Sequence, residues 1–549
     1  MIILRTVGTA VYVASLWSAV ALADQPVADG AGETAAPVLT AAASGTATIE
    51  ASRDAALEVA IGQLVAEPSP TLDAAGREDR AALASFYDSR KGAPLWVSAT
   101  GVTANGRALA KAIGGAAAYG LDPAAFTLPD LAPTNDPHAL ATVEVGLTLA
   151  ALTYARHARG ARIVDPAGML NSNLDRKPQF IRPGDVLARL VGADDVPAAL
   201  AALHPVHPQF ERLRQAFLDE TADGKGGGRL NATAKRLRAN MEFWRWMWDD
   251  LGALHVFNNI PEYMQYVVRD GTIIRADRIV VGELGKQSSV FSRPLQEVVL
   301  RPRWRVPESI MVHELWPSLL KGGGMMRRFG LEITTKSGEP RDWRTIDWSR
   351  DDIRNYHVWQ PPGGKSVLGF VKFSFPSQHT IFMHDTPDKW MFNARQRTLS
   401  HGCLRVRNPM ELAEIVLAYD RGWDRAKVAQ LSQSGPLDNE VAMQKHIPIH
   451  LAYFTAWAGE DGKVRYFNDI YGHEKRVTQA LDGEWSKIVK GRNHLAPVKP
   501  RFDPDKVASG SVATVPANAA PRGFVPGVAV KPKKGGGSLA DVIADALGL

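Results

Sequence analysis

The chain has 549 residues, of which 45% are hydrophobic and 22% charged, a composition typical of a globular protein with two or three domains. Most of the net charge of +6 comes from residues 490–549, where nine Lys or Arg stand against four Asp or Glu. No basic surface is therefore spread over the fold, and nucleic acid is not an expected partner. The single cysteine, Cys403, excludes an internal disulfide.

The N-terminus has the pattern of an export signal. Arg5 precedes an apolar run that ends at Val20, and Ala-Leu-Ala at 21–23 supplies a small-x-small cleavage site. Residues 1–23 are therefore predicted to be a signal peptide, and the mature protein is expected in a bacterial periplasm. An uncleaved inner-membrane anchor is the alternative, but the run lacks flanking basic clusters. In an oxidising compartment an unpaired thiol is either an inert buried group or a reactive one.

Changes in sequence texture divide the rest of the chain. Residues 24–50 are rich in Ala, Thr and Gly and are predicted to be a disordered spacer. Helical periodicity over 51–252 predicts a helical scaffold domain. Short β-prone runs over 253–425 predict a β-rich catalytic domain, with a hairpin turning at Asp270-Gly271 and a polar excursion at 308–360. The predicted fold class is multidomain α+β.

A helix is predicted directly after the cysteine. Asn408 is expected to cap it, with Pro409 in its first position and Glu411 at capping-box spacing. Its apolar face is expected to consist of Leu412, Ile415, Val416 and Tyr419. Residues 426–495 are predicted to be a strand-containing extension, and residues 496–549 a basic low-complexity tail with a short amphipathic end.

The tetrapeptide Ser-His-Gly-Cys at 400–403 indicates nucleophilic chemistry. A thiol attacks carbonyl groups as the thiolate, and a free pKa of about 8.5 leaves little thiolate at neutral pH. A nearby imidazole can remove the proton. The candidates are His384, at the end of a predicted strand, and His401. The amides around 402–403 are expected to point at a developing oxyanion, so the predicted chemistry is acyl transfer through a thioester.

With His384 upstream and fifteen residues between it and Ser400, the SHGC motif followed by Leu404-Arg405 resembles the signature of the L,D-transpeptidases with a YkuD-type catalytic domain. Further similarity to the long periplasmic YcbB-type branch covers roughly residues 80–475. It includes FYDSRKGAPLW, ANMEFWRWMWDDLG, RPRWRVPESI and WQPPGGKSVLGFVKFSFPS. The resemblance implies a helical scaffold domain and a β-rich catalytic domain whose active site is covered by an inserted capping subdomain, expected at 308–360.

The resemblance assigns roles to five residues. Cys403 is expected to be the nucleophile and His384 the general base. His401 and Ser400 are expected to support them, by orienting the imidazole or assisting the oxyanion. Gly402 is expected to let the substrate approach the backbone closely.

Three further residues are expected at the substrate. Arg405 faces the substrate or, alternatively, braces the loop that carries the thiol or forms a structural ion pair. Trp304, in a segment resembling the family's PxWxVP run, is expected in the wall of the donor-peptide site, and Asp385 is expected to contact the substrate. Phe382 stands where Tyr is expected in this branch, so any hydrogen bond from that hydroxyl is missing.

The reaction implied by the resemblance uses a tetrapeptide stem of peptidoglycan as donor. Cys403 attacks the carbonyl of the L-centre of the third residue, usually meso-diaminopimelate, and the terminal D-Ala leaves. The side-chain amine of a second stem peptide then resolves the thioester as a 3→3 cross-link. No metal or organic cofactor is implied, and carbapenems are expected to acylate the enzyme.

Several alternatives stay open. Water could resolve the same thioester, which is L,D-carboxypeptidase activity, or an amine of an outer-membrane protein could resolve it and attach that protein to the wall. A non-catalytic wall-binding scaffold with an idle thiol belongs to a different class. So does a zinc protein with His384, His401 and Cys403 as ligands, although the sequence lacks a second cysteine.

Two features bear on how the protein reaches the wall. Many relatives carry a small peptidoglycan-binding module between scaffold and catalytic domain, but here only DETADGKGGG, residues 219–228, occupies that place. Wall docking is then expected to rest on the scaffold, the cap or the basic tail. Trp244, Trp246 and Trp248 are predicted to pack between helix and sheet rather than to form a glycan platform.

Overall fold

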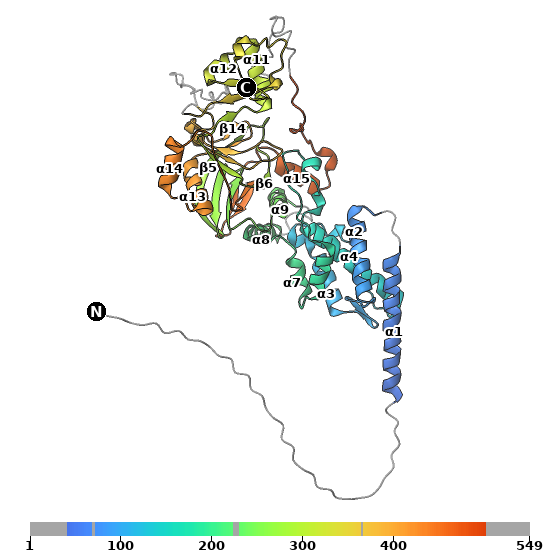
Figure 1. Cartoon of the computed structure of the whole chain (residues 1–549). Helices are drawn as coiled ribbons and strands as arrows, with labels where there is room; N and C mark the ends of the chain where they lie inside the picture. The colour runs from blue at the N-terminus through green and yellow to red at the C-terminus, as the bar shows by residue number, and fades with distance from the viewer. Residues whose placement is uncertain (1–40, 68–71, 223–229, 364–365, 501–549) are drawn as a thin grey trace, which may run out of the picture. The chain divides into compact units, whose positions relative to one another are not determined.

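The structure is a computed structural model that describes residues 41–67, 72–222, 230–363 and 366–500 (Figure 1). The predicted signal peptide and most of the basic tail, including its amphipathic end, lie outside these residues. Helix α1 (Ala41–Ala66) begins inside the predicted spacer. The spacer prediction therefore does not hold for residues 41–50, where Ala, the best helix former, is frequent. By its contacts the chain divides into residues 1–55 and 56–549, and the architecture below is that of the second unit.

The predicted scaffold domain is helical. Its helices are α2 (Ala74–Ser89), α3 (Ala104–Gly114), α4 (Pro137–Ala158), α5 (Pro166–Met169), α6 (Pro183–Val191), α7 (Val196–Ala201), α8 (Pro208–Ala222) and α9 (Ala232–Arg245), with a small hairpin of β1 (Val97–Ser98) and β2 (Gly101–Val102). Side-chain caps begin several of them, because an oxygen at that position satisfies an amide that the first turn leaves unpaired. Asp136, for example, accepts a 2.8 Å hydrogen bond from the Ala139 amide at the start of α4.

Helix α4 forms the centre of the scaffold core. Its Glu144 is fully buried, and the carboxylate accepts hydrogen bonds from the backbone amides of Leu95, Trp96 and Val97 at 2.7 to 3.1 Å. Among the described residues α4 is the one helix whose length and hydropathy meet the criteria for crossing a membrane, but 67% of that stretch is buried inside the protein. Such burial is expected of a core helix, and we assign α4 to the scaffold core.

A single large sheet carries the catalytic domain. Its strands run in the order β16-β7-β12-β13-β15-β5-β4-β3-β17-β6, and β14 pairs with β5 off this path. The strands are β3 (Leu254–Asn259), β4 (Met264–Arg269), β5 (Thr272–Gly282), β6 (Phe291–Pro294), β7 (Glu297–Leu300), β12 (Val371–Ser374), β13 (Met383–His384), β14 (Thr398–Ser400), β15 (Leu404–Val406), β16 (Asn439–Ala442) and β17 (Pro448–Ala452). The predicted multidomain α+β fold is confirmed.

The predicted hairpin is present. Strands β4 and β5 are antiparallel, with Arg269 opposite Thr272, so Asp270 and Gly271 form a two-residue turn. Both turn residues have positive φ, +49° and +78°. A type I′ turn requires this conformation, and Asp-Gly is one of the pairs that adopt it most readily.

The extension predicted at 426–495 contains strands, and two of them join the large sheet. Strand β17 pairs in parallel with β3, and β16 pairs with β7, although more than 130 residues separate each pair in sequence. The remaining elements here are α14 (Arg425–Ser434), β18 (Ala456–Ala458), β19 (Val464–Tyr466) and α15 (His473–Leu481). Strand pairing across such distances leaves no local signal in the sequence, so the sequence does not predict which strands these two join.

Helix α13 (Pro409–Arg421) follows the cysteine as predicted, and Figure 1 shows it with α14 beside the sheet. The predicted capping box is wrong. The Asn408 side chain makes no cap and instead donates to Asp277 at 2.7 Å, while Glu411 pairs with Arg275. The N-terminus of the helix therefore makes tertiary contacts with β5 and has no local side-chain cap.

The tryptophan prediction is confirmed. Trp244 and Trp246 each have 1% of their surface exposed, and Trp248 is half-buried against the same core. Trp244 stacks on Phe454 with ring centroids 4.6 Å apart. These rings join α9 to the sheet and its flanking loops.

Residues 304–360 form a layer of their own. A four-stranded sheet in the order β10-β9-β11-β8 packs with short helices around a separate apolar core that includes Trp316, Ile333 and Val358. The elements are β8 (Trp304–Arg305), β9 (Glu332–Thr335), β10 (Pro340–Arg341), β11 (Tyr356–Gln360), α10 (Glu308–Ile310), the π-helical turn η4 (Met311–Leu315), α11 (Trp316–Leu320) and α12 (Gly324–Phe329). This layer, called the cap below, occupies the predicted excursion.

Candidate active site

The sheet brings the two ends of the predicted catalytic segment together. Strands β13 and β15 are parallel neighbours, with His384 directly opposite Arg405, and the Leu404 amide donates to the Phe382 carbonyl at 3.1 Å. Residues opposite each other share a face of a sheet, and so do residues two apart on one strand. Cys403 directly precedes β15, and the alternation of that strand, continued back by one residue, would place its side chain on the face that carries His384.

His384 is held as a neutral ring with a defined orientation. Its Nδ1 lies 2.5 Å from the Asp385 carbonyl oxygen. Because a carbonyl can only accept, Nδ1 carries the proton and Nε2 is the basic nitrogen. Burial, with only 5% of the residue exposed, and to a lesser extent the charge of Arg405 lower the pKa of His384 to about 3. At neutral pH this imidazole is ready to accept a proton.

Cys403 is half-buried beside the loop that precedes β13. Its Sγ lies 3.9 Å from the Thr380 carbonyl oxygen. Burial of the sulfur raises the pKa of the thiol to about 11, against a smaller lowering by the Phe382 backbone and by the charges of Lys372 and Arg405. Thiol and imidazole are thus both neutral in the resting structure. Formation of the thiolate then requires proton transfer at the moment of attack.

Hydrogen bonds fix the loop that carries the thiol. The Ser400 hydroxyl donates to the Cys403 carbonyl at 2.6 Å and accepts from the Gly402 amide at 3.2 Å, and Ser288 donates to the Gly402 carbonyl at 2.6 Å. Gly402 has φ +114°, a conformation that favours glycine. Ser400 therefore contacts the loop backbone rather than an imidazole. Of the two amides expected to face an oxyanion, that of Gly402 is already engaged within the loop.

His401 turns toward the cap. Its Nε2 lies 2.7 Å from the carboxylate of Glu314 in η4, and the same carboxylate accepts from Lys286 Nζ at 2.9 Å. Charged side chains from the cap and from the loop after β5 therefore meet at His401. The sequence analysis missed Glu314 because nothing in a helical segment 87 residues upstream indicates a contact with the motif.

Arg405 and Asp385 point into the fold. Arg405 has 2% of its surface exposed, and its guanidinium lies 3.6 Å from the Asp388 carboxylate. Burial lowers the pKa of Arg405 to about 10, so the group stays positively charged on the face of the sheet that it shares with His384. The Asp385 carboxylate accepts from the Phe370 and Thr386 amides at 3.0 and 2.7 Å. The contact with Asp388 corresponds to the ion-pair alternative for Arg405, and the carboxylate of Asp385 has backbone partners.

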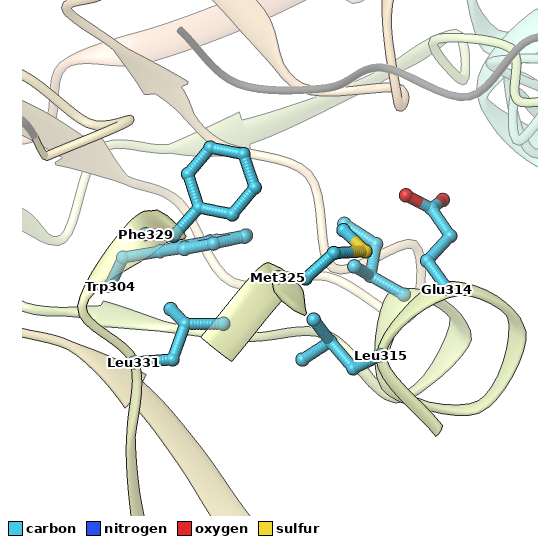
Figure 2. A pocket seen from close by; sticks show the side chains of 7 residues that line it. Trp304, Glu314, Leu315, Met325, Phe329 and Leu331 are labelled. Atoms are coloured by element: carbon cyan, nitrogen blue, oxygen red, sulfur yellow. The ribbon is translucent and has the colours of Figure 1, made fainter. Parts of the chain in front are cut away.

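Trp304 lines an apolar pocket in the cap, shown in Figure 2. The empty space within it, including the part open to solvent, is about 270 Å³. The other lining residues are Ile310, Glu314, Leu315, Met325, Phe329 and Leu331. Glu314 is the single charged side chain of this lining, and it is the residue that contacts His401. The pocket is therefore linked directly to the motif loop.

Metal ligands were also considered. Over residues 41–500, apart from their three undescribed gaps, no three His, Cys, Asp or Glu side chains form a group suited to a metal ion. His384 and His401 each direct a ring nitrogen at a protein oxygen instead, the Asp385 carbonyl and the Glu314 carboxylate.

The large sheet, with His384 ending β13 and Cys403 directly before the neighbouring β15, and the cap in contact with His401 are the arrangement expected of a cysteine acyltransferase domain. Comparison with known proteins agrees. Residues 254–428 match the model of the L,D-transpeptidase catalytic domain (YkuD), and residues 81–217 match a scaffold domain. A Haemophilus influenzae protein named "Putative L,D-transpeptidase" is 26% identical over 418 residues, which is 74% of this chain and 81% of that protein. The chain carries a catalytic domain of the L,D-transpeptidase (YkuD) family.

Proposed function

We propose that this protein is a peptidoglycan L,D-transpeptidase that forms 3→3 cross-links through a thioester on Cys403. The Cys403 thiol transfers its proton to Nε2 of His384 as the sulfur attacks the carbonyl of the third residue of a donor stem. The bond to the terminal D-Ala breaks, and the imidazolium returns the proton to the leaving amine. The amine of an acceptor stem then displaces the thiol and completes the cross-link.

The observation that carries this proposal is the parallel pairing of β13, which ends at His384, with β15, which Cys403 directly precedes, within a domain of the YkuD family. The orientation of His384 supports the base role, because its proton sits on Nδ1 and its other nitrogen is available to the thiol. Arg405 supports thiolate formation, since a buried positive charge nearby favours the anion.

We also propose that the protein acts in the periplasm. The N-terminal pattern of Arg5, an apolar run and a small-x-small site supports export. The substrate class of the family, peptidoglycan, lies in that compartment. Mass spectrometry of the mature protein from cells would test this proposal, and an intact N-terminus would indicate an uncleaved anchor.

Muropeptide analysis tests the reaction. Cells or sacculi supplied with the protein should gain 3→3 cross-links, and the Cys403→Ala variant should produce none. Tripeptide stems without new cross-links would indicate resolution by water. Outer-membrane proteins bound covalently to purified sacculi would indicate a protein amine as acceptor.

The non-catalytic alternative is tested by acylation. Meropenem should add its mass to the folded protein, and the adduct should map to Cys403, because a β-lactam carbonyl traps an activated thiol. No adduct on correctly folded protein would favour a wall-binding scaffold. Stoichiometric zinc in purified protein would favour the metal alternative.

A further inference from the structure

The contact between Glu314 and His401 joins the cap to the catalytic loop. Glu314 lies in η4, a π-helical turn, and such turns frequently occur at functional sites. Its carboxylate meets His401 Nε2 at 2.7 Å and Lys286 Nζ at 2.9 Å, and its side chain is only 17% exposed. Burial raises the pKa of Glu314, but the hydrogen bonds and charges of His401 and Lys286 lower it more, so the net pKa is below the usual value. The group is therefore a carboxylate at neutral pH.

The same side chain belongs to the apolar pocket. Figure 2 shows Glu314 at its rim, with the carboxylate turned away from Leu315, while Trp304 and Phe329 form the opposite wall. The cap and the loop carrying Cys403 thus meet at one buried, charge-assisted contact. Such hydrogen bonds are stronger than neutral ones and fix geometry.

We propose that Glu314 is a positioning residue for the acylation step. It acts by binding His401 and thereby keeps the loop 400–403 in a fixed position relative to the cap. The inference rests on the proposed function, in which Cys403 is the nucleophile. Glu314 does not touch the reacting atoms. Its effect is transmitted through His401, two residues before the thiol.

A double-mutant cycle tests this transmission. Glu314→Ala should slow acylation by meropenem by roughly ten- to a hundredfold, the cost of a small displacement of a reacting group. Glu314→Gln keeps the volume and a hydrogen-bond acceptor, and should lose less. The pair Glu314→Ala and His401→Ala should be non-additive, with the double variant about as slow as the slower single variant. Additive losses would overturn the proposal, as would a wild-type rate in Glu314→Ala.

Hydrogen exchange supplies a readout that needs no activity. Peptides covering 398–406 should exchange faster in Glu314→Ala than in the wild type. Glu308→Gln is the matched control, an exposed glutamate of the same cap, and should change neither exchange nor acylation. Unchanged exchange in Glu314→Ala would refute the proposal that Glu314 positions the loop. A wild-type protein that does not react with meropenem would contradict the proposed function instead, and the exchange comparison would still test the positioning role of Glu314.

A second, independent feature is a strap, residues 490–499, that first contacts the scaffold. The Asn171 side chain donates to the Lys490 carbonyl at 2.6 Å, and Lys490 Nζ donates to the Gly168 carbonyl at 2.7 Å. Four residues on, Nδ1 of His494 lies 2.8 Å from the Ser172 hydroxyl. The strap thus follows the loop after α5.

The strap next contacts the loop beside the thiol. Nε2 of His494 lies 2.7 Å from Nδ1 of His379, and the two rings stack with centroids 5.0 Å apart. The other ring nitrogen of His379 lies 2.9 Å from Asp175. His379 directly precedes Thr380, whose carbonyl oxygen is the one near Cys403 Sγ.

The strap then contacts the cap. Nε2 of His313 donates to the Lys499 carbonyl at 3.0 Å, and Val498 packs against the apolar core of the cap. His313 is the neighbour of Glu314. Within ten residues the strap therefore contacts the scaffold, the loop beside the thiol, and the cap segment that contacts His401.

We infer that the strap restrains the cap against the catalytic sheet, so that losing the strap frees the cap to open. A chain that stops after Val489 and the variant His494→Ala should both exchange backbone hydrogens of residues 308–329 faster. A chain that stops after Pro500 retains the strap and serves as the control for the truncation. The variant His138→Ala, at an exposed histidine, serves as the control for His494→Ala. Exchange in the cap that is unchanged without the strap would refute the inference, whether or not the protein proves to be an L,D-transpeptidase.

Discussion

Replacing His384 by Ala tests whether the thiol is activated during attack rather than beforehand. The pKa of Cys403 is raised to about 11 by burial and that of His384 is lowered to about 3, so neither is charged at neutral pH. With that pKa the unaided thiolate fraction at pH 7 is on the order of 10⁻⁴, and it rises about tenfold per pH unit. A wild-type enzyme that uses His384 as base should be nearly independent of pH between about 5 and 9.

The magnitude follows from these values. General-base catalysis contributes about 10²- to 10⁴-fold, so His384→Ala should acylate slower by that factor at pH 7. The loss should shrink on going to pH 10, by up to about 10³-fold, because the thiolate fraction increases by that amount, and a loss smaller than this at pH 7 should disappear. The assay is the rate of meropenem adduct formation on intact protein at each pH, with spontaneous hydrolysis of the β-lactam subtracted.

Two results would refute this reasoning. A constant ratio of wild-type to variant rates across the pH range would show that His384 does not act as a base. A wild-type rate that titrates with a pKa near neutrality would show a preformed thiolate, contrary to the neutral pair that burial imposes here.

Three further predictions can be checked with the same protein. Cys403→Ala should give no meropenem adduct while its thermal midpoint stays near that of the wild type, because the thiol is half-buried; an adduct elsewhere would identify another nucleophile. Gly402→Ala should lower stability by about 1–2 kcal/mol and also slow acylation, since its φ of +114° disfavours a side chain and an added Cβ would lie 3.3 Å from the Gln287 carbonyl; wild-type values would argue against a fixed loop. The pKa of Asp175 is lowered to about 2 by its hydrogen bond to His379. A lowered carboxyl pKa contributes stability above about pH 4 that is lost as pH falls toward 2, by no more than about 2 kcal/mol, and urea unfolding of Asp175→Asn should lack this loss.

Much of the candidate site follows from local sequence. The SHGC motif indicates thiol chemistry because it places the single cysteine two residues after a histidine. A short β-prone run indicates that His384 ends a strand. The pair Asp270-Gly271 specifies the turn between β4 and β5, because few residue pairs tolerate two successive positive φ angles. Trp244 is buried as expected because large apolar rings stabilise a core.

Other features were decided only by the tertiary structure. Periodicity tells which face of an element is buried, but not which distant element covers it. For this reason the contact of Glu314 with His401, the position of β17 within the catalytic sheet, and the stacking of His494 on His379 have no signal in the sequence. Asn408 shows the same limit locally: its sequence context specifies a helix cap, yet the carboxylate of Asp277, 131 residues away, takes its hydrogen bond. Local patterns determined the reacting groups and their strands, whereas long-range packing determined what holds them.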